Sequence, residues 1–307
     1  MGPTQPTASG TSVAVGRRAL SARYRLGRAR RGHTLMALAF LAPALIVYGV
    51  FMVYPFLGSL YLSLTEWNGF DAIPRFIGLD NYVRLWTDER AWHAFGNNLI
   101  WAVIGTAAPI LIGLPLAIAM WSGVRYRLLF RTIYFLPFIL PLVVVGIIWL
   151  WIYHPIYGVP FVRGILGDRE SALYGVLITA VWGYFGFVVV VLLAGLQNVN
   201  LDLVDASKVD GANAWQRARH VIIPQIAPVM TTVTTITLVG AFSVFDVVYV
   251  MTSGGPGDAT EVLALYMFDR AFRFNEMGYA SSIATVITML SLVLAIVFVR
   301  FRERSAA

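Results

Sequence analysis

The sequence predicts an all-α, polytopic helical membrane protein with six transmembrane helices. Hydrophobic residues make up 58% of its 307 residues and charged residues only 13%, which is too little charge to cover a soluble protein of this length. The mean hydropathy is +0.72. Six apolar stretches are long enough to cross a hydrocarbon core, which takes about 20 helical residues. Because these stretches are continuously apolar, they do not fit the alternating pattern of a transmembrane β-barrel.

The first segment, residues 1–32, is rich in Gly, Ser, Thr and Arg and has no apolar periodicity. We expect a mobile cytoplasmic tail whose arginines fix the topology and contact anionic membrane lipid. Residues 33–307 follow as one transmembrane domain, because no internal repeat stands out within them. The absence of cysteine excludes disulfides and thiol chemistry.

The predicted spans lie, in chain order, near residues 36–57, 99–121, 132–153, 173–195, 226–250 and 280–299. Proline inside a helix removes a backbone hydrogen bond, so each proline within a span predicts a kink. These prolines are Pro43, Pro109, Pro115, Pro137 and Pro141. Between spans, residues 78–82 predict a turn into a short helix, and residues 253–257 predict a tight turn followed by a helical pattern.

The distribution of basic residues predicts the orientation. An even number of spans places both termini on one side of the membrane. Of the 23 arginine and lysine residues, 16 lie in the two terminal segments and in the second and fourth loops between spans. The positive-inside rule therefore predicts that both termini and the loop at 197–224 are cytoplasmic. The net charge of +7 is explained by this topology and does not indicate a nucleic-acid partner.

A polar segment, residues 205–224, separates two apolar spans and predicts a cytoplasmic helical hairpin. We expect a short helix, a break at Gly211, and a second helix that ends at Pro224, where the next span opens. Small residues allow a helix to lie closely in a groove, and the carboxylates of Asp205 and Asp210 offer charge to basic partner residues. A structured hairpin of this kind favours a docking element for another protein. The alternative is an ordinary solvated loop with acidic helix caps.

The sequence contains no set of residues that predicts catalysis. The four histidines fall in separate tails and loops, and no pair has metal-ligand spacing. The single lysine, Lys208, is not part of a glycine-rich loop that could hold a phosphate. We therefore predict a non-catalytic subunit with no cofactor of its own. If ATP drives this protein, another chain must bind it.

The hairpin residues resemble the cytoplasmic signature loop of the permease subunits of bacterial binding-protein-dependent ABC importers. That pattern is an acidic residue and two small residues, then Asp-Gly-Ala, then an aliphatic pair that ends in proline. The sequence departs from it in having Asp205 in place of the usual Glu and Ser207 as the second small residue. The resemblance implies that the residues that couple the chain to an ATPase are Asp205, Ala206, Ser207, Asp210, Gly211, Ala212 and Pro224.

A second set of residues resembles the sugar-uptake branch of this family. Residues 242–249, 251–257 and 278–281 are similar to the first permease of maltose, lactose or glycerol-3-phosphate systems. The resemblance implies a six-helix permease in the bacterial inner membrane, paired with a second permease as a heterodimer. It also implies two ATPase subunits, which bind ATP and Mg, and an extracytoplasmic solute-binding protein.

Asp246 is the only acidic or basic residue within the six predicted spans, so it is a candidate functional residue. We expect Phe242, Phe245, Asp246 and Tyr249 to share one helical face, because they follow the spacing i, i+3, i+4, i+7. Aromatic faces stack on sugar C–H groups and a carboxylate accepts hydroxyl donors, so this face predicts a carbohydrate path. The alternative is that Asp246 reaches interfacial water or pairs with the partner permease.

No basic residue lies within the predicted spans, which favours a neutral sugar or oligosaccharide as the solute. Another small polar solute, such as a glycerol phosphate ester, remains the alternative. A secondary transporter would carry more intramembrane ionisable groups or broken-helix repeats. A membrane-embedded enzyme would need a convergent catalytic set, and a general scaffold would not explain the hairpin.

Overall fold

The computed structural model describes residue 36 and residues 39–123 and 125–306, so the predicted tail at 1–32 lies outside the described residues. The chain divides into two units at Gly58. The described part of the first unit belongs to one helix, Ala39–Leu62, which contains the π-helical turn η1 (Gly49–Val53) and continues as α2 (Tyr54–Leu62). This 24-residue helix corresponds to the first predicted span.

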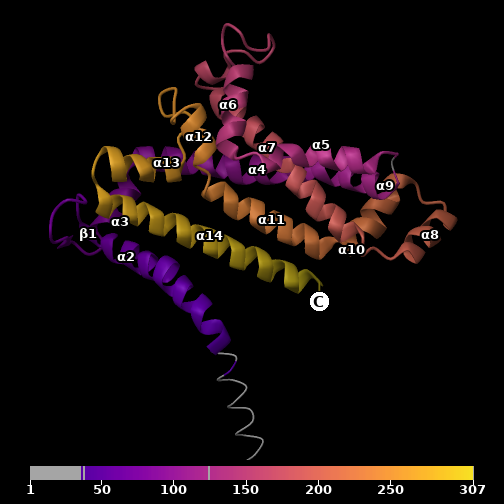
Figure 1. Ribbon diagram of the computed structural model, residues 1–307, viewed down its shortest axis with the longest axis horizontal. Coiled ribbons are helices and arrows are strands. Elements are labelled where there is room, and N and C mark those ends of the chain that lie inside the picture. The colour runs from indigo at the N-terminus through magenta and orange to yellow at the C-terminus, as the bar shows by residue number, and fades with distance from the viewer. Residues whose placement is uncertain (1–35, 37–38, 124, 307) are drawn as a thin grey trace, which may run out of the picture. The chain divides into compact units, whose positions relative to one another are not determined.

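The second unit is almost entirely helical, as Figure 1 shows. Its helices are α3 (Asp80–Thr87), α4 (Glu89–Trp121), α5 (Arg127–Ile139), α6 (Leu142–Ile152), η2 (Ile165–Gly167), α7 (Ala172–Leu196), α8 (Leu201–Val209), α9 (Ala214–Arg217), η3 (Ala218–Ile222), α10 (Ile223–Gln225), α11 (Ala227–Phe242), α12 (Asp246–Met251), α13 (Leu263–Phe268), η4 (Asp269–Arg273) and α14 (Met277–Ala306). A two-stranded antiparallel sheet of β1 (Thr65–Glu66) and β2 (Arg75–Phe76) precedes α3, with Thr65 opposite Phe76. Helix α3 and the tight turn after α12 agree with the prediction from the sequence, whereas this sheet was not predicted.

Four helices of the described chain are long and apolar enough to cross a membrane. Two further pairs of helices are each bent at a short break, and the number of spans reaches six if each bent pair is counted as one span. The continuous helices are Ala39–Leu62, Glu89–Trp121, Ala172–Leu196 and Met277–Arg300. The bent pairs are Leu128–Ile139 with Leu142–Ile152, at 97°, and Ala214–Gln225 with Ala227–Phe242, at 77°. The prediction of a polytopic all-α membrane protein is confirmed.

The 97° bend has a local cause in the sequence. Leu140, the residue before Pro141, is extended (φ −73°, ψ 136°), and α6 starts directly after the proline. A residue before proline is disfavoured in the helical region, so α5 ends there. In contrast, Pro109 and Pro115 lie inside the single helix α4, and Pro137 lies inside α5. Of these four prolines, only Pro141 coincides with a break in the helix.

Helix α4 packs along α7, and this pair forms the centre of the second unit (Figure 1). Close approach depends on small residues: Gly113 of α4 faces Val188 of α7, and a Cβ atom on Gly186 of α7 would overlap the carbonyl oxygen of Tyr134 in α5. Two clusters of buried apolar side chains flank this contact. One lies at the end that carries α8 and includes Leu192 and Ile226, and the other lies toward α12 and α13.

Candidate functional site

The fifth predicted span, near 226–250, is interrupted. Helix α11 ends at Phe242, residues 243–245 form a non-helical connection, and α12 begins at Asp246. The backbone of Phe245 adopts φ −141° and ψ −59°, outside the helical region. A break within a membrane span leaves backbone groups without their helical partners, and these groups need other hydrogen bonds.

One side chain of α4 bonds to both the end of α11 and the start of α13. The side-chain amide of Asn98 donates to the carbonyl oxygen of Ala241 at 2.8 Å, and its oxygen accepts from the backbone N–H of Leu263 at 2.8 Å. The adjacent Asn97 donates to the carbonyl oxygens of Ala259 and Glu261, in the segment before α13, at 3.1 and 2.7 Å. Both asparagines are buried, so Asn98 fixes the end of α11 against α4 and the two together fix the start of α13 there.

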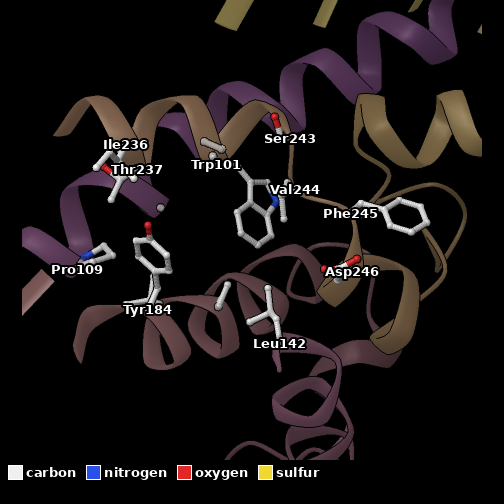
Figure 2. A pocket seen from close by; sticks show the side chains of 15 residues that line it. Trp101, Pro109, Leu142, Tyr184, Ile236, Thr237, Ser243, Val244, Phe245 and Asp246 are labelled. Atoms are coloured by element: carbon white, nitrogen blue, oxygen red, sulfur yellow. The ribbon is translucent and has the colours of Figure 1, made fainter. Parts of the chain in front are cut away.

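A cavity of about 300 Å³ lies beside the break. Figure 2 shows its lining, which comes from α4, α6, α7, α11 and the connection to α12. Most of the wall is apolar or aromatic, and a few polar side chains are placed within it. The polar and aromatic lining residues are Trp101, Tyr184, Thr237, Ser243, Phe245 and Asp246. Small-molecule sites have this composition, with an apolar wall and a few polar groups that orient the ligand.

Trp101 provides an unused hydrogen-bond donor at this cavity. Its side chain is 4% exposed, and its indole Nε1 has no hydrogen-bond partner among the described residues. A buried N–H without a partner costs free energy, and because this atom has almost no accessible surface in this conformation, a solute would recover that cost only once the lining moves apart. Trp101 was not predicted from the sequence, because a tryptophan in an apolar span carries no signal of its own.

The break separates the four residues that were predicted to share one helical face. Phe245 and Asp246 line the cavity, but Phe242 is buried against Phe95, with ring centroids 6.5 Å apart. Tyr249 lies outside the lining and stacks on Phe245 at 5.2 Å. The prediction of one continuous face is therefore wrong, since the spacing i, i+3, i+4, i+7 aligns residues only within an unbroken helix.

The predicted hairpin is present at the other end of α7. Its first arm is α8, and its second arm runs through α9, η3 and α10 (Figure 1). Gly211 between the arms has φ +78°, which glycine adopts without strain. Asn213 and Gln216 form a capping box that starts the second arm. The backbone N–H of Asn200 donates to Gln225 Oε1 at 2.8 Å, which closes the base of the hairpin.

The second arm ends one residue after the predicted Pro224. Pro224 lies inside this arm, in α10, which ends at Gln225, and the 77° bend falls at Ile226. The next span starts at Ala227, within one residue of its predicted start near 226, and has Pro228 in its first turn. Proline is tolerated in a first turn because its missing N–H has no helical partner there. Pro228, and not Pro224, therefore opens this span.

The hairpin is anchored on one side and open on the other. Val204, Ile222 and Ile226 are buried against α7 in the cluster that includes Leu192. Six of the predicted coupling residues lie at the turn or on the first arm, and four of these are exposed: Asp205, Ala206, Asp210 and Gly211. Ser207 and Ala212 are half-buried, and the Ser207 hydroxyl donates to the carbonyl oxygen of Val204 at 2.6 Å.

Two exposed apolar side chains extend this open surface. Val209 is 89% exposed and Trp215 is 68% exposed. Exposed aromatic and aliphatic side chains on a polar, well-ordered hairpin are typical of protein-binding surfaces. Neither was predicted as a contact residue from the sequence, although their apolar character within a polar segment was a visible signal.

A buried polar cluster lies where α4 and α14 begin. Two tyrosine hydroxyls donate to Asp88 Oδ2, that of Tyr279 at 2.6 Å and that of Tyr266 at shorter range. Burial is the largest single influence on the pKa of Asp88 and raises it. The two hydroxyls, the backbone N–H of Ala91 and the charge of Arg270 outweigh burial and hold that pKa below its usual value. Burial, together with the bond to Asp88, raises the pKa of Tyr266 to about 12.

The described residues contain no group of three or more His, Asp or Glu side chains that could hold a metal ion.

Residues 109–306, about two thirds of the chain, match the family model described as binding-protein-dependent transport system inner membrane component. The chain belongs to this family. The match includes the hairpin and the helices from α5 to α14, and it begins within α4, after Trp101 of the cavity. The family assignment makes the chain an inner-membrane permease of an ABC transporter.

Individual permeases of this family are similar over nearly the whole chain. The lactose transport system permease protein LacF of Rhizobium radiobacter is 34% identical over 284 residues, which cover 86% of this chain and 93% of the relative. The probable starch degradation products transport system permease protein AmyD of Thermoanaerobacterium thermosulfurigenes is 30% identical over 272 residues, or 86% and 93% of the two chains.

The permease fold also matches a solved structure. A crystal structure of a bacterial ABC transporter involved in the import of the acidic polysaccharide alginate contains a chain that superposes with a TM-score of 0.75. The superposition covers 91% of this permease and 99% of that chain, at 23% sequence identity. At this level of identity the likeness establishes the fold.

Proposed function

We propose that this permease forms half of the membrane pathway of an ATP-driven importer for a neutral sugar or oligosaccharide. The observation that carries the solute class is the cavity at the break between α11 and α12. Its aromatic wall suits the C–H faces of a sugar, and Trp101 Nε1 and the Asp246 carboxylate suit hydroxyl groups. The names of the lactose and starch-product relatives support the same class.

The charge of the cavity supports a neutral solute over a phosphate ester. Among the described lining residues there is no arginine or lysine, and Asp246 is the charged one. A sugar phosphate or glycerol phosphate ester would meet a carboxylate without a compensating cation, which disfavours its binding. An anionic solute is therefore the second candidate, and it requires the partner permease to supply the positive charge.

We further propose that the second permease subunit completes the pathway, and that two ATPase subunits bind ATP and Mg and dock on the hairpin. The solute arrives from an extracytoplasmic solute-binding protein. The excess of basic residues beside the termini and the hairpin supports a cytoplasmic location for these parts. In this arrangement Asp205, Ala206, Asp210 and Gly211 face the ATPase, with Val209 and Trp215 as apolar contacts.

The rigid base of the hairpin suggests how the coupling works. Val204, Ile222 and Ile226 fix the hairpin to α7, and the bend at Ile226 leads directly into α11. A push on the hairpin by closing ATPase subunits would therefore move α7 and α11 together, and α11 ends at the cavity. The chain itself remains non-catalytic in this scheme.

The experiment compares two glycines in the complete importer reconstituted in liposomes. Gly211 and Gly123 both have positive φ angles, of 78° and 96°, and a Cβ on either would meet no atom within 4 Å. We expect Gly211→Pro to assemble in the membrane but to lose ATP hydrolysis stimulated by the sugar-loaded binding protein. Gly211→Ala should lose it in part, and Gly123→Ala should retain it.

Normal coupled transport by Gly211→Pro would contradict the role of the hairpin. The solute class is tested separately by sugar-stimulated hydrolysis with a panel of neutral sugars and sugar phosphates. Stimulation by phosphate esters alone would contradict the neutral-sugar proposal and leave the coupling result standing.

A further inference from the structure

Helix α3 carries an apolar stripe that no described residue covers. Leu79 at its N-cap, Val83 and Trp86 are 66%, 64% and 73% exposed. They follow the spacing i, i+4, i+7, so they lie on one face of the helix. The stripe continues into the preceding segment, where Phe76 of β2 and Ile73 are also exposed. A face of this composition would be costly to leave in water.

The other two sides of α3 have different partners. On one side, the buried side-chain amide of Asn81 donates to the carbonyl oxygens of Ser63 and Thr65, both at 2.9 Å. On the other side, Asp80 and Arg84 are exposed charged residues. The helix therefore has a buried side, a polar side and an apolar side, and its rotation about its own axis is fixed by the Asn81 bonds.

Two contacts place α3 at the level where membrane spans begin. The Arg84 guanidinium donates to both carboxylate oxygens of Glu276 at 2.9 Å and lies 4.0 Å from the ring centroid of Tyr279. Glu276 directly precedes α14, and Tyr279 lies in its first turn. At its C-terminal end, α3 is separated by the single residue Asp88 from α4, another span. Figure 1 shows α3 beside the start of α14.

An aromatic pair joins the stripe to the surface of α4. The rings of Trp86 and Trp92 pack edge to face, with centroids 5.1 Å apart, and the Trp92 indole N–H donates to the Trp86 carbonyl oxygen at 2.8 Å. Trp92 is 45% exposed, and Leu99 and Val103, further along α4, are exposed as well. The apolar face of α3 thus continues onto the exposed apolar surface of a membrane span.

We propose that α3 lies in the membrane–water interface, with Leu79, Val83 and Trp86 inserted at the boundary between lipid headgroups and acyl chains. The occupant of this face is the lipid of the bilayer in which α4 and α14 are embedded. Tryptophan concentrates at this depth because its ring is large and apolar and its N–H remains near water. A short amphipathic helix with a polar side and an apolar side lies in the plane of the interface. Because α3 is bound to the first turn of α14, it anchors that end of the span at a fixed depth.

The test uses single-cysteine variants of this chain, which has no cysteine of its own, in an importer whose other subunits are made cysteine-free. Leu79→Cys places a fluorophore on the apolar side, and Asp80→Cys places the same fluorophore on the polar side, because successive helical residues point about 100° apart. Both are measured in the complete importer in bilayers of phosphatidylcholine and phosphatidylglycerol. We expect nitroxide lipids labelled near the headgroup to quench position 79 severalfold more than position 80, and a water-soluble quencher to show the reverse order.

Two outcomes would overturn the proposal. Equal access of the water-soluble quencher to positions 79 and 80 would mean that the apolar face lies in solvent. If neither quencher reached position 79, a protein would cover this face, either the second permease or the solute-binding protein. Measurements with and without the solute-binding protein distinguish these two proteins. Quenching that changes when it is added indicates that the solute-binding protein covers the face, and unchanged quenching indicates the second permease.

Discussion

The guanidinium group of Arg90 forms two hydrogen bonds, of 2.6 and 2.8 Å, with the carboxylate of Glu261. Glu261 is 1% exposed, so its negative charge is stabilised by Arg90 and hardly at all by solvent. Burial raises the pKa of Glu261 above its usual value, and the two bonds from Arg90 oppose that rise. The pair connects the first turn of α4 to the segment before α13, where Asn97 also donates to the backbone carbonyl of Glu261.

Removing the guanidinium should therefore destabilise the permease strongly. We expect Arg90→Leu to lower the free energy of unfolding by about 3–5 kcal/mol, because it leaves a buried carboxylate without a partner. Arg75→Leu is the control, since Arg75 pairs with Glu66 on the exposed surface and should cost less than about 1 kcal/mol. Thermal unfolding of the purified protein, followed by tryptophan fluorescence, measures both. Equal melting temperatures would contradict the prediction.

The Asp88 cluster predicts a dependence of stability on pH. The pKa of Asp88 is held below its reference value of 3.8, so its stabilising contribution is present above about pH 4 and is lost as the pH falls through the folded-state pKa. The pKa of Tyr266 is raised to about 12, so the stability that its hydroxyl contributes is fully present below pH 10 and is lost only as the pH rises through about 12.

An Asp88→Asn variant tests the acidic side of this dependence. Wild type should be more stable than Asp88→Asn at pH 7, and the difference in stability should shrink below pH 4. Melting curves from pH 3 to pH 7 measure this, and a constant difference would be inconsistent with it.

Two tryptophans allow a matched test of the cavity. Trp101 and Trp149 both have a buried indole N–H without a hydrogen-bond partner in the described chain, but only Trp101 lines the cavity. Trp101→Phe keeps an aromatic ring and removes the N–H. A hydrogen bond to the solute contributes about 1 kcal/mol, so its loss should reduce the rate of sugar transport about fivefold. Trp149→Phe should transport at the wild-type rate. The same loss in both variants would argue against a role for the indole N–H in the pathway.

Close packing between α5 and α7 predicts a large effect from one methyl group. A Cβ on Gly186 would overlap the carbonyl oxygen of Tyr134, and backbone cannot move aside as a flexible side chain can. We expect Gly186→Ala to lower stability by about 1–3 kcal/mol. Gly96→Ala in α4 is the control, because its Cβ would meet no atom within 4 Å and alanine favours helix by about 1 kcal/mol. A melting temperature of Gly186→Ala at or above that of wild type would refute the close contact.

The sequence predicted the spans and the hairpin well because their signals are local. Long apolar runs indicate helices in lipid, and the helix break at Gly211 follows from glycine's tolerance of positive φ. The break at residues 243–245 could not be predicted in the same way. No proline or glycine occupies these three positions, and the hydrogen bonds of the break come from Asn98, more than 140 residues earlier in the chain.

The same reasoning explains the errors at the cavity. The spacing of Phe242, Phe245, Asp246 and Tyr249 fits a helix, so the pattern alone predicts one face. Tertiary hydrogen bonds override that pattern, and the wall of the cavity is assembled from several helices instead. Trp101 has a role in this wall that only its spatial neighbours reveal.

The two hydrogen bonds of Asn98 have a consequence for how a solute is received. One bond satisfies the carbonyl of Ala241 at the end of α11 and the other satisfies the N–H of Leu263 at the start of α13, so the protein itself holds both of these points on α4 without a ligand. A solute that binds beside them therefore does not have to offset the conformational entropy lost by ordering them. This part of the cavity wall is preorganised, and discrimination between solutes then depends on how well each one fits it.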